Sequence, residues 1–125
     1  MSQLLLLDSY RSETGDLTVF EKIFPDHIKR VSFFQGSDND CYGGYRHKST
    51  KLALVCLSGH CRVLCKAKGL ERVYDLDSAQ KCLLLSPEDW FFIEEISKDA
   101  KILLLANKPY SAEELIYESC QLATV

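Results

Sequence analysis

The chain has 125 residues, of which 46% are hydrophobic and 26% charged, a balance that predicts one folded domain and excludes a disordered chain. Its formal net charge of -3 provides no basic footprint for DNA or RNA, so no nucleic-acid partner is expected. The longest uninterrupted apolar stretch, residues 52–57, is too short to span a bilayer, and the N-terminus lacks the features of a secretion signal. We therefore expect a soluble, cytoplasmic protein that does not bind membranes.

Short apolar runs recur along the chain, and turn-forming residues close each one. Runs of about five residues, separated by turn signals roughly every eight to twelve positions, are typical of an all-β sandwich or barrel. Leucine is abundant and does not itself favour strands, but none of these runs reaches helical length before a breaker. The expected strands cover residues 4–7, 17–20, 28–34, 52–57, 61–66, 72–76, 82–85, 91–96 and 101–105.

The C-terminal segment differs from the rest of the chain and predicts one α-helix. Ser111 is suited to be an N-cap, and the two carboxylates at 113–114 would lie in the first turn, where the helix dipole favours negative charge. Leu115, Ile116 and Cys120 then follow at helical spacing. No second domain or linker is indicated, so residues 1–125 are interpreted as a single domain.

Six cysteines could suggest disulfides or a zinc site, but their spacing favours neither. There is no Cys-x-x-Cys pair, and Cys61 and Cys65 would lie about 13 Å apart along a strand, too far to share one tetrahedral metal. Without a secretion signal, we expect reduced thiols that behave as small buried hydrophobes. The six are Cys41, Cys56, Cys61, Cys65, Cys82 and Cys120.

Only one of the three histidines stands among other groups that are suited to chemistry. His27 and His60 fall in turns, where we expect them to be solvated. His47 follows Tyr-Gly-Gly-Tyr-Arg at 42–46, whose two glycines allow the backbone to bend or to approach a ligand closely. An ordinary polar start to a strand is the alternative interpretation. The candidate cluster is Tyr42, Tyr45, Arg46, His47 and Lys48.

A set of short motifs, in one order and with almost no gaps, resembles a known family along nearly the whole chain. The family is that of the small cupins called sugar 3,4-ketoisomerases, or WxcM-like proteins. Any one motif is weak, whereas the co-linear set is fairly specific. The motifs include Gly15-Asp16-Leu17, Ile28-Lys29-Arg30-Val31, Gly43 with His47-Lys48, Leu54-Val55-Cys56-Leu57-Ser58-Gly59, Pro87 with Trp90, and Tyr110.

This resemblance implies a fold and an activity. The fold would be a jelly-roll β-barrel, paired as a homodimer that often exchanges N-terminal strands. The activity would be that of an isomerase without metal or other cofactor, acting on a dTDP-4-oxo-6-deoxy sugar during the synthesis of deoxyamino sugars for surface polysaccharides. A base would remove the proton at C3 of the sugar, an enediol would form, and a proton would be returned at C4.

The sequence departs from the family pattern at several site positions. Tyr42 stands where the family has an arginine, Tyr45 replaces the first of two histidines, and only the second remains, as His47. The family's Trp-His pair becomes Trp90-Phe91, and Leu52 occupies the place of a pocket glutamine. One remaining imidazole does not make a metal centre.

These positions lead to an assignment of roles. His47, with an unperturbed pKa of about 6.5, is suited to be the acid/base, whereas Tyr45, with a pKa of about 10, would donate a proton. The residues expected to bind substrate are Tyr42, Arg30, Arg46, Lys48 and Trp90.

Two hypotheses remain open from the sequence. The chain is either a sugar-nucleotide 3,4-ketoisomerase that uses His47 and Tyr45, or a catalytically degenerate cupin that binds a sugar, a nucleotide or a protein partner without turnover. The retained imidazole favours the first, and the replaced site residues motivate the second. Fold resemblance does not decide between them, because activity resides in the site.

Overall fold

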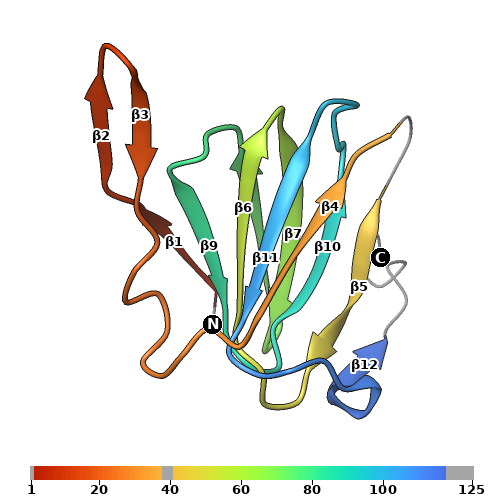
Figure 1. The fold of residues 1–125 in the computed structure, drawn as a ribbon. Coiled ribbons are helices and arrows are strands. Elements are labelled where there is room, and N and C mark those ends of the chain that lie inside the picture. The colour runs from red at the N-terminus through yellow and green to blue at the C-terminus, as the bar shows by residue number, and fades with distance from the viewer. Residues whose placement is uncertain (1, 38–40, 118–125) are drawn as a thin grey trace.

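The computed structural model describes residues 2–37 and 41–117, which form two five-stranded antiparallel sheets and a separate two-stranded hairpin (Figure 1). One sheet has the order β1-β9-β6-β11-β4, the other β12-β5-β10-β7-β8, and the hairpin pairs β2 with β3. The predicted all-β class is therefore confirmed. The strands are β1 Gln3–Leu6, β2 Ser9–Ser12, β3 Gly15–Thr18, β4 Arg30–Gln35, β5 Tyr42–His47, β6 Leu52–Ser58, β7 Cys61–Ala67, β8 Leu70–Leu76, β9 Lys81–Leu85, β10 Trp90–Glu94, β11 Lys101–Ala106 and β12 Leu115–Tyr117.

The main core lies between the two five-stranded sheets. Side chains alternate along each strand, so every second residue of β7 and β10 points inward, as Val63 and Phe91 do. From the opposite sheet, β6 contributes Leu52 and Leu54 to the same core. Each of these four side chains is at most 2% exposed, and their burial is the main force that holds the sheets together.

A second apolar cluster explains why β6 is hydrophobic at consecutive positions. Ala53 and Val55 point away from the main core and pack with Ile23 and Phe24, which come from the segment between β3 and β4. A strand that is covered on both faces reads as a continuous apolar run rather than an alternating one. This is the reason that the run at 52–57 stands out in the sequence.

The cysteines follow the prediction at the positions that the structure describes, with one exception. Cys56, Cys61, Cys65 and Cys82 are buried free thiols, as expected of small hydrophobes, whereas Cys41 is exposed. Cys120 lies outside the described residues.

The predicted C-terminal helix is wrong for the residues that the structure describes. Residues 112–114 form a single 3-10 turn, and β12 follows directly and pairs with β5. Strand pairing wins because β5 would otherwise present an open edge of unpaired backbone groups. A helix of fewer than about twelve residues is marginal without such tertiary support. Cys120, which completed the helical pattern, lies beyond the described residues, and no helix within them is long and apolar enough to cross a membrane.

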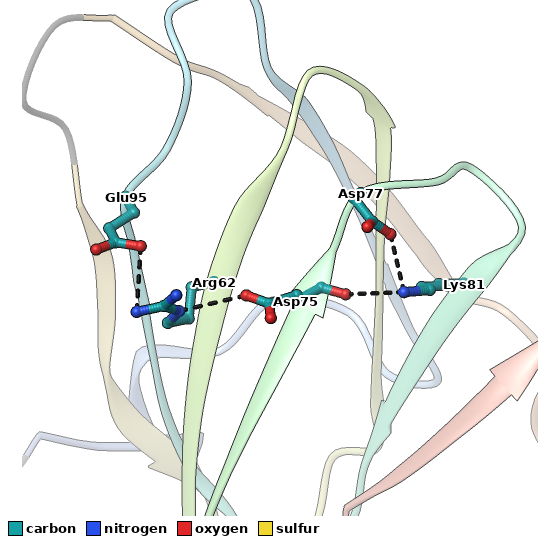
Figure 2. A network of polar contacts seen from close by, with 5 residues as sticks. All are labelled: Arg62, Asp75, Asp77, Lys81 and Glu95. Carbon is teal, nitrogen blue, oxygen red and sulfur yellow. Dashed lines mark hydrogen bonds and ion pairs between the residues drawn. The ribbon is translucent and has the colours of Figure 1, made fainter.

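A chain of exposed ion pairs ties the outer surface of β7 and β8 to their neighbours (Figure 2). The Arg62 guanidinium lies 3.3 Å from carboxylate oxygens of both Asp75 and Glu95. Lys81 Nζ lies 2.8 Å from an Asp77 carboxylate oxygen. Exposed pairs of this kind contribute little to stability because water and salt screen them.

A β-bulge in β5 decides which of its side chains face the core. Phe91 of β10 pairs with Tyr45, but the next residue, Phe92, pairs with Gly43, so Gly44 is the extra residue. Without this insertion, Tyr42 and Tyr45 would point to opposite faces of the sheet, because they are three positions apart. The bulge turns both rings toward the interior, where their hydroxyl oxygens lie 2.9 Å apart.

We predict that Gly43→Ala destabilises the protein by about 1–3 kcal/mol, measured by urea unfolding. Gly43 has a φ of +113°, and an added Cβ would lie 2.8 Å from the Phe91 carbonyl oxygen. Gly69→Ala is the matched control, because Gly69 has a φ of +81° with nothing within 4 Å of an added Cβ. Equal losses in the two variants would mean that the close approach to Phe91 is unimportant.

Candidate functional site

Three side chains of β5 meet on the inner face of its sheet. The Tyr45 ring lies between Tyr42 and His47, with centroid distances of 6.0 and 5.4 Å and edge-on geometry in both cases. Tyr45 and His47 alternate inward in the ordinary way of a strand, and the bulge adds Tyr42 to them. Tyr45 is only 6% exposed and His47 only 5%. The structure thus places one imidazole and two phenols together in the interior.

His47 is a buried imidazole with an unused hydrogen-bonding atom. Its Nε2 is buried and has no hydrogen-bond partner among the described residues. Leaving a buried polar atom unpaired costs about 1–3 kcal/mol, and such atoms call for an explanation. Burial lowers the pKa of His47, and the positive charge of Arg30 lowers it further, whereas the negative charge of Glu114 opposes them. The neutral form, which can accept a proton, therefore prevails at neutral pH.

Tyr45 has the opposite tendency and holds its proton. Burial, followed by the hydrogen bond with Tyr42, raises the pKa of Tyr45 well above its ordinary value. The ring also packs edge-on against Phe91 at 4.9 Å and against Tyr117 at 5.3 Å. At neutral pH this phenol is therefore protonated, so it is a hydrogen-bond donor and not a base.

Arg30, which belongs to the other sheet, acts on this cluster through its charge. It is the first residue of β4 and pairs with Ala106 of β11. Its guanidinium carbon lies 5.6 Å from the centroid of the Tyr110 ring, a cation–π arrangement. The charge lowers the pKa of both His47 and Tyr45, so Arg30 disfavours an imidazolium and favours negative charge near the phenol.

The other predicted site residues are not brought together with His47. Arg46 alternates to the outer face of the sheet, where it forms an ion pair with Glu88. Trp90 also lies on the outer face, because its neighbour Phe91 points into the core, and its ring stacks on Phe92 at 6.2 Å. Arg46 and Trp90 line an open outer groove of about 1010 Å³.

The remaining histidines and Lys48 are exposed. Lys48 follows the end of β5, and its backbone N–H donates to the Glu114 carbonyl oxygen at 2.9 Å. His27 and His60 are exposed, as the sequence predicted for turn residues. Within residues 2–37 and 41–117, no group of three or more histidine, cysteine or acidic side chains is arranged to hold a metal ion.

Sequence reasoning missed two residues beside this cluster, Glu114 and Tyr117. The sequence predicts Glu114 as a charge in the first turn of a helix. In the structure its carboxylate instead accepts hydrogen bonds from Ser49 and Thr50. Tyr117 was expected to lie on a helix, but β12 places its ring against Tyr45. The one usable signal was the short apolar run Leu-Ile-Tyr at 115–117, and three apolar residues do not distinguish a strand from a helix.

Comparison with known proteins decides the family. A family model described as FdtA, WxcM-like, C-terminal matches residues 1–124 of the chain. The chain belongs to the WxcM-like family. A curated relative, the TDP-4-oxo-6-deoxy-alpha-D-glucose-3,4-oxoisomerase of Aneurinibacillus thermoaerophilus, is 31% identical over 105 residues, which cover 82% of this chain and 76% of that protein.

Solved structures of 3,4-ketoisomerases have the same fold. The 3,4-ketoisomerase QdtA of Thermoanaerobacterium thermosaccharolyticum, solved with TDP-4-keto-6-deoxyglucose, superposes with a TM-score of 0.88 at 27% identity, covering 94% of this chain and 87% of that one. The WlaRB TDP-quinovose 3,4-ketoisomerase of Campylobacter jejuni gives 0.88 at 27%, covering 94% and 92%. The jelly-roll cupin architecture expected from the resemblance is thereby confirmed.

We predict that burial of His47 makes the protein less stable in mild acid. The pKa of His47 is lowered in the folded state from an ordinary value of 6.5, so the unfolded chain binds more protons as the pH falls below about 6.5. The free energy of unfolding should therefore decrease from pH 7.5 to pH 5.5, and His47→Gln should flatten this part of the profile. His27→Gln, at an exposed position, is the control. Identical slopes for wild type and His47→Gln would contradict the prediction.

Proposed function

We propose that the protein is a 3,4-ketoisomerase of a dTDP-4-oxo-6-deoxyhexose and serves deoxyamino-sugar or surface polysaccharide synthesis. The observation that carries this proposal is the buried Nε2 of His47, which has no partner among residues 2–37 and 41–117 and lies beside a protonated phenol, inside a barrel of the WxcM-like family. The names of the relatives, which are TDP-sugar 3,4-keto- or oxoisomerases, supply the substrate class. Four buried free thiols are in keeping with a cytoplasmic site for this chemistry.

The reaction moves a carbonyl from C4 to C3 of the sugar and needs one base and one proton donor. Neutral His47 removes the proton at C3, and the electron pair forms the C3–C4 double bond while the C4 oxygen takes a proton from Tyr45. The enediol then returns the proton of the C3 hydroxyl to Tyr45, and His47 delivers its proton to C4. Protons and electrons balance, and both residues end in their starting states.

Arg30 is suited to stabilise the charge that develops during this proton transfer. An enediolate oxygen carries negative charge, and a fixed cation in a site of low dielectric stabilises it more than water would. Arg30 already favours negative charge on Tyr45 and disfavours positive charge on His47. It therefore stabilises the anionic intermediate and keeps His47 unprotonated before the reaction, while it opposes the imidazolium that forms when His47 takes the C3 proton.

Access to the site involves the half-buried aromatic rings around it. Phe34 of β4 and Tyr42 of β5 pack with centroids 5.3 Å apart, and Tyr42 in turn contacts Tyr45. Because His47 is almost fully enclosed, a sugar reaches Nε2 only when such rings rotate aside. We assign Tyr42 to substrate binding for this reason, whereas Arg46 and Trp90 line the groove on the outer face of the sheet.

We predict that the protein exchanges the C3 proton of dTDP-4-oxo-6-deoxyglucose for deuterium in D₂O, followed by NMR. His47→Ala should reduce this exchange by about 100- to 10,000-fold, the usual contribution of a general base. Tyr45→Phe should slow formation of the 3-oxo product more than it slows C3 exchange, since it removes the donor and keeps the base. His60→Ala is the control at an exposed imidazole.

Absence of C3 exchange in the wild-type protein would contradict an isomerase. Thermal shift with dTDP then tests whether the protein binds a nucleotide without turnover, because a ligand that binds the folded state must raise the apparent stability. A rise without exchange would indicate the binding-only cupin.

We also propose a homodimer in which N-terminal strands contact the partner. The β2–β3 hairpin projects from the barrel beyond β1 (Figure 1), and it exposes Tyr10 and Leu17 by 61% and 63%. An isolated two-stranded hairpin is marginally stable in water, so it needs a surface to cover it. The edge strand β4 offers two apolar side chains, Val31 and Phe33, that are 62% and 66% exposed.

We predict that the protein elutes as a dimer in size-exclusion chromatography with light scattering. Tyr10→Asp with Leu17→Asp should shift the equilibrium to monomers, because charges at an apolar interface lose solvation without gaining partners. Leu70→Asp, at an exposed apolar position of β8, is the control. A wild-type protein that stays monomeric at high micromolar concentration would contradict this assembly.

A further inference from the structure

The Glu114 carboxylate binds the loop that follows the strand carrying His47. Its Oε1 accepts hydrogen bonds from the Ser49 backbone N–H at 3.0 Å, the Ser49 hydroxyl at 2.8 Å and the Thr50 hydroxyl at 2.7 Å. The Thr50 bond and then the Ser49 bonds hold the pKa of Glu114 at about 2, so the carboxylate is ionised throughout the physiological range. These three contacts form a clamp, here called the Glu114 clamp, between the 3-10 turn and the β5–β6 loop.

The Glu114 clamp leads directly into the pairing of β12 with β5. The Lys48 N–H donates to the Glu114 carbonyl oxygen at 2.9 Å, and the next residue, Leu115, is the cross-strand partner of His47. Two positions on, Tyr117 pairs with Tyr45 and its ring contacts the Tyr45 ring. A strand of three residues has few hydrogen bonds of its own, so an anchor at Glu114, the residue just before it, matters.

We propose that Glu114 is a positioning residue of the isomerase site: it fastens β12 along β5 and thereby holds His47 and Tyr45 in their working geometry. The inference rests on the proposed function for its catalytic consequence. Its structural part, the effect of Glu114 on the His47 imidazole, can be measured without any turnover. Misplacing a reacting group by about 1 Å can cost on the order of 100-fold in rate, which sets the scale of the effect.

The charges around His47 predict a second effect of Glu114. The groups that act on the imidazole are Arg30 of β4, which disfavours the imidazolium, and Glu114, which favours it. The phenol of Tyr45 is neutral, and Lys108 contacts the Ser49 hydroxyl at 2.6 Å on the far side of the clamp. Removing the negative charge of Glu114 therefore shifts the balance toward Arg30 and moves the His47 titration to lower pH.

The decisive experiment compares Glu114→Gln with Glu113→Gln. Glu113 lies in the same 3-10 turn and is exposed, so it is matched in substitution and position. We expect Glu114→Gln to lower kcat by about 10- to 100-fold with little change in KM, and to move both the acid limb of kcat/KM and the imidazole NMR titration of His47 to lower pH. Glu113→Gln should change none of these.

Two further variants allow the proposal to be tested even if Glu114→Gln destabilises the protein. Thr50→Val removes one bond of the clamp and keeps the charge, so it should lower kcat and leave the His47 titration where it is. Glu114→Asp keeps the charge and should restore part of the lost rate. If Glu114→Gln and Glu113→Gln have the same kcat and the same His47 titration, the proposal is overturned. A wild-type protein without turnover, in which Glu114→Gln still moves the titration, would overturn the proposed function and support the clamp.

Discussion

The one-residue bulge between β5 and β10 is the constraint on which the interior site depends. Its extra residue, Gly44, changes the parity of β5, so that Tyr42 and Tyr45 face the same side of the sheet. The backbone there comes so close to Phe91 that a side chain at Gly43 would collide with it. A local backbone irregularity thus determines which functional groups share the interior with His47.

Placing an imidazole in this interior has a cost that helps explain its chemistry. An apolar side chain of similar size would pack there without an unpaired nitrogen, whereas Nε2 of His47 has no partner within the described part of the chain. The same burial keeps the imidazole neutral and keeps the Tyr45 phenol protonated. A neutral imidazole therefore lies beside a protonated phenol, which is the arrangement that the proposed proton transfer between adjacent carbons requires.

Much of the fold could be read from the sequence, because runs of about five residues closed by turns leave few alternatives to an all-β sandwich. The continuous apolar run at 52–57 correctly predicted a buried strand, and the position of His47 before that strand marked it as a candidate site residue. The bulge could not be predicted from the sequence. Gly43 and Gly44 indicate that the backbone can bend there, but they do not determine how β5 pairs with its neighbouring strand. Arg46 and Trp90 were grouped with His47 by proximity in the sequence and by resemblance, and strand alternation places them on the other face.

The error at the C-terminus is the more instructive one. Glu114 has the sequence context of a helix N-terminus, and its negative charge fits that role as well as it fits the loop contacts that the structure shows. Tertiary pairing with β5 decides between them, and it brings near His47 a negative charge whose effect on the imidazole pKa opposes that of the positive charge of Arg30. The protonation state of the imidazole then follows from burial and from two charges supplied by different edges, β4 and the turn before β12. Neither edge strand contains His47, so a site of this kind is specified only once both sheets have assembled.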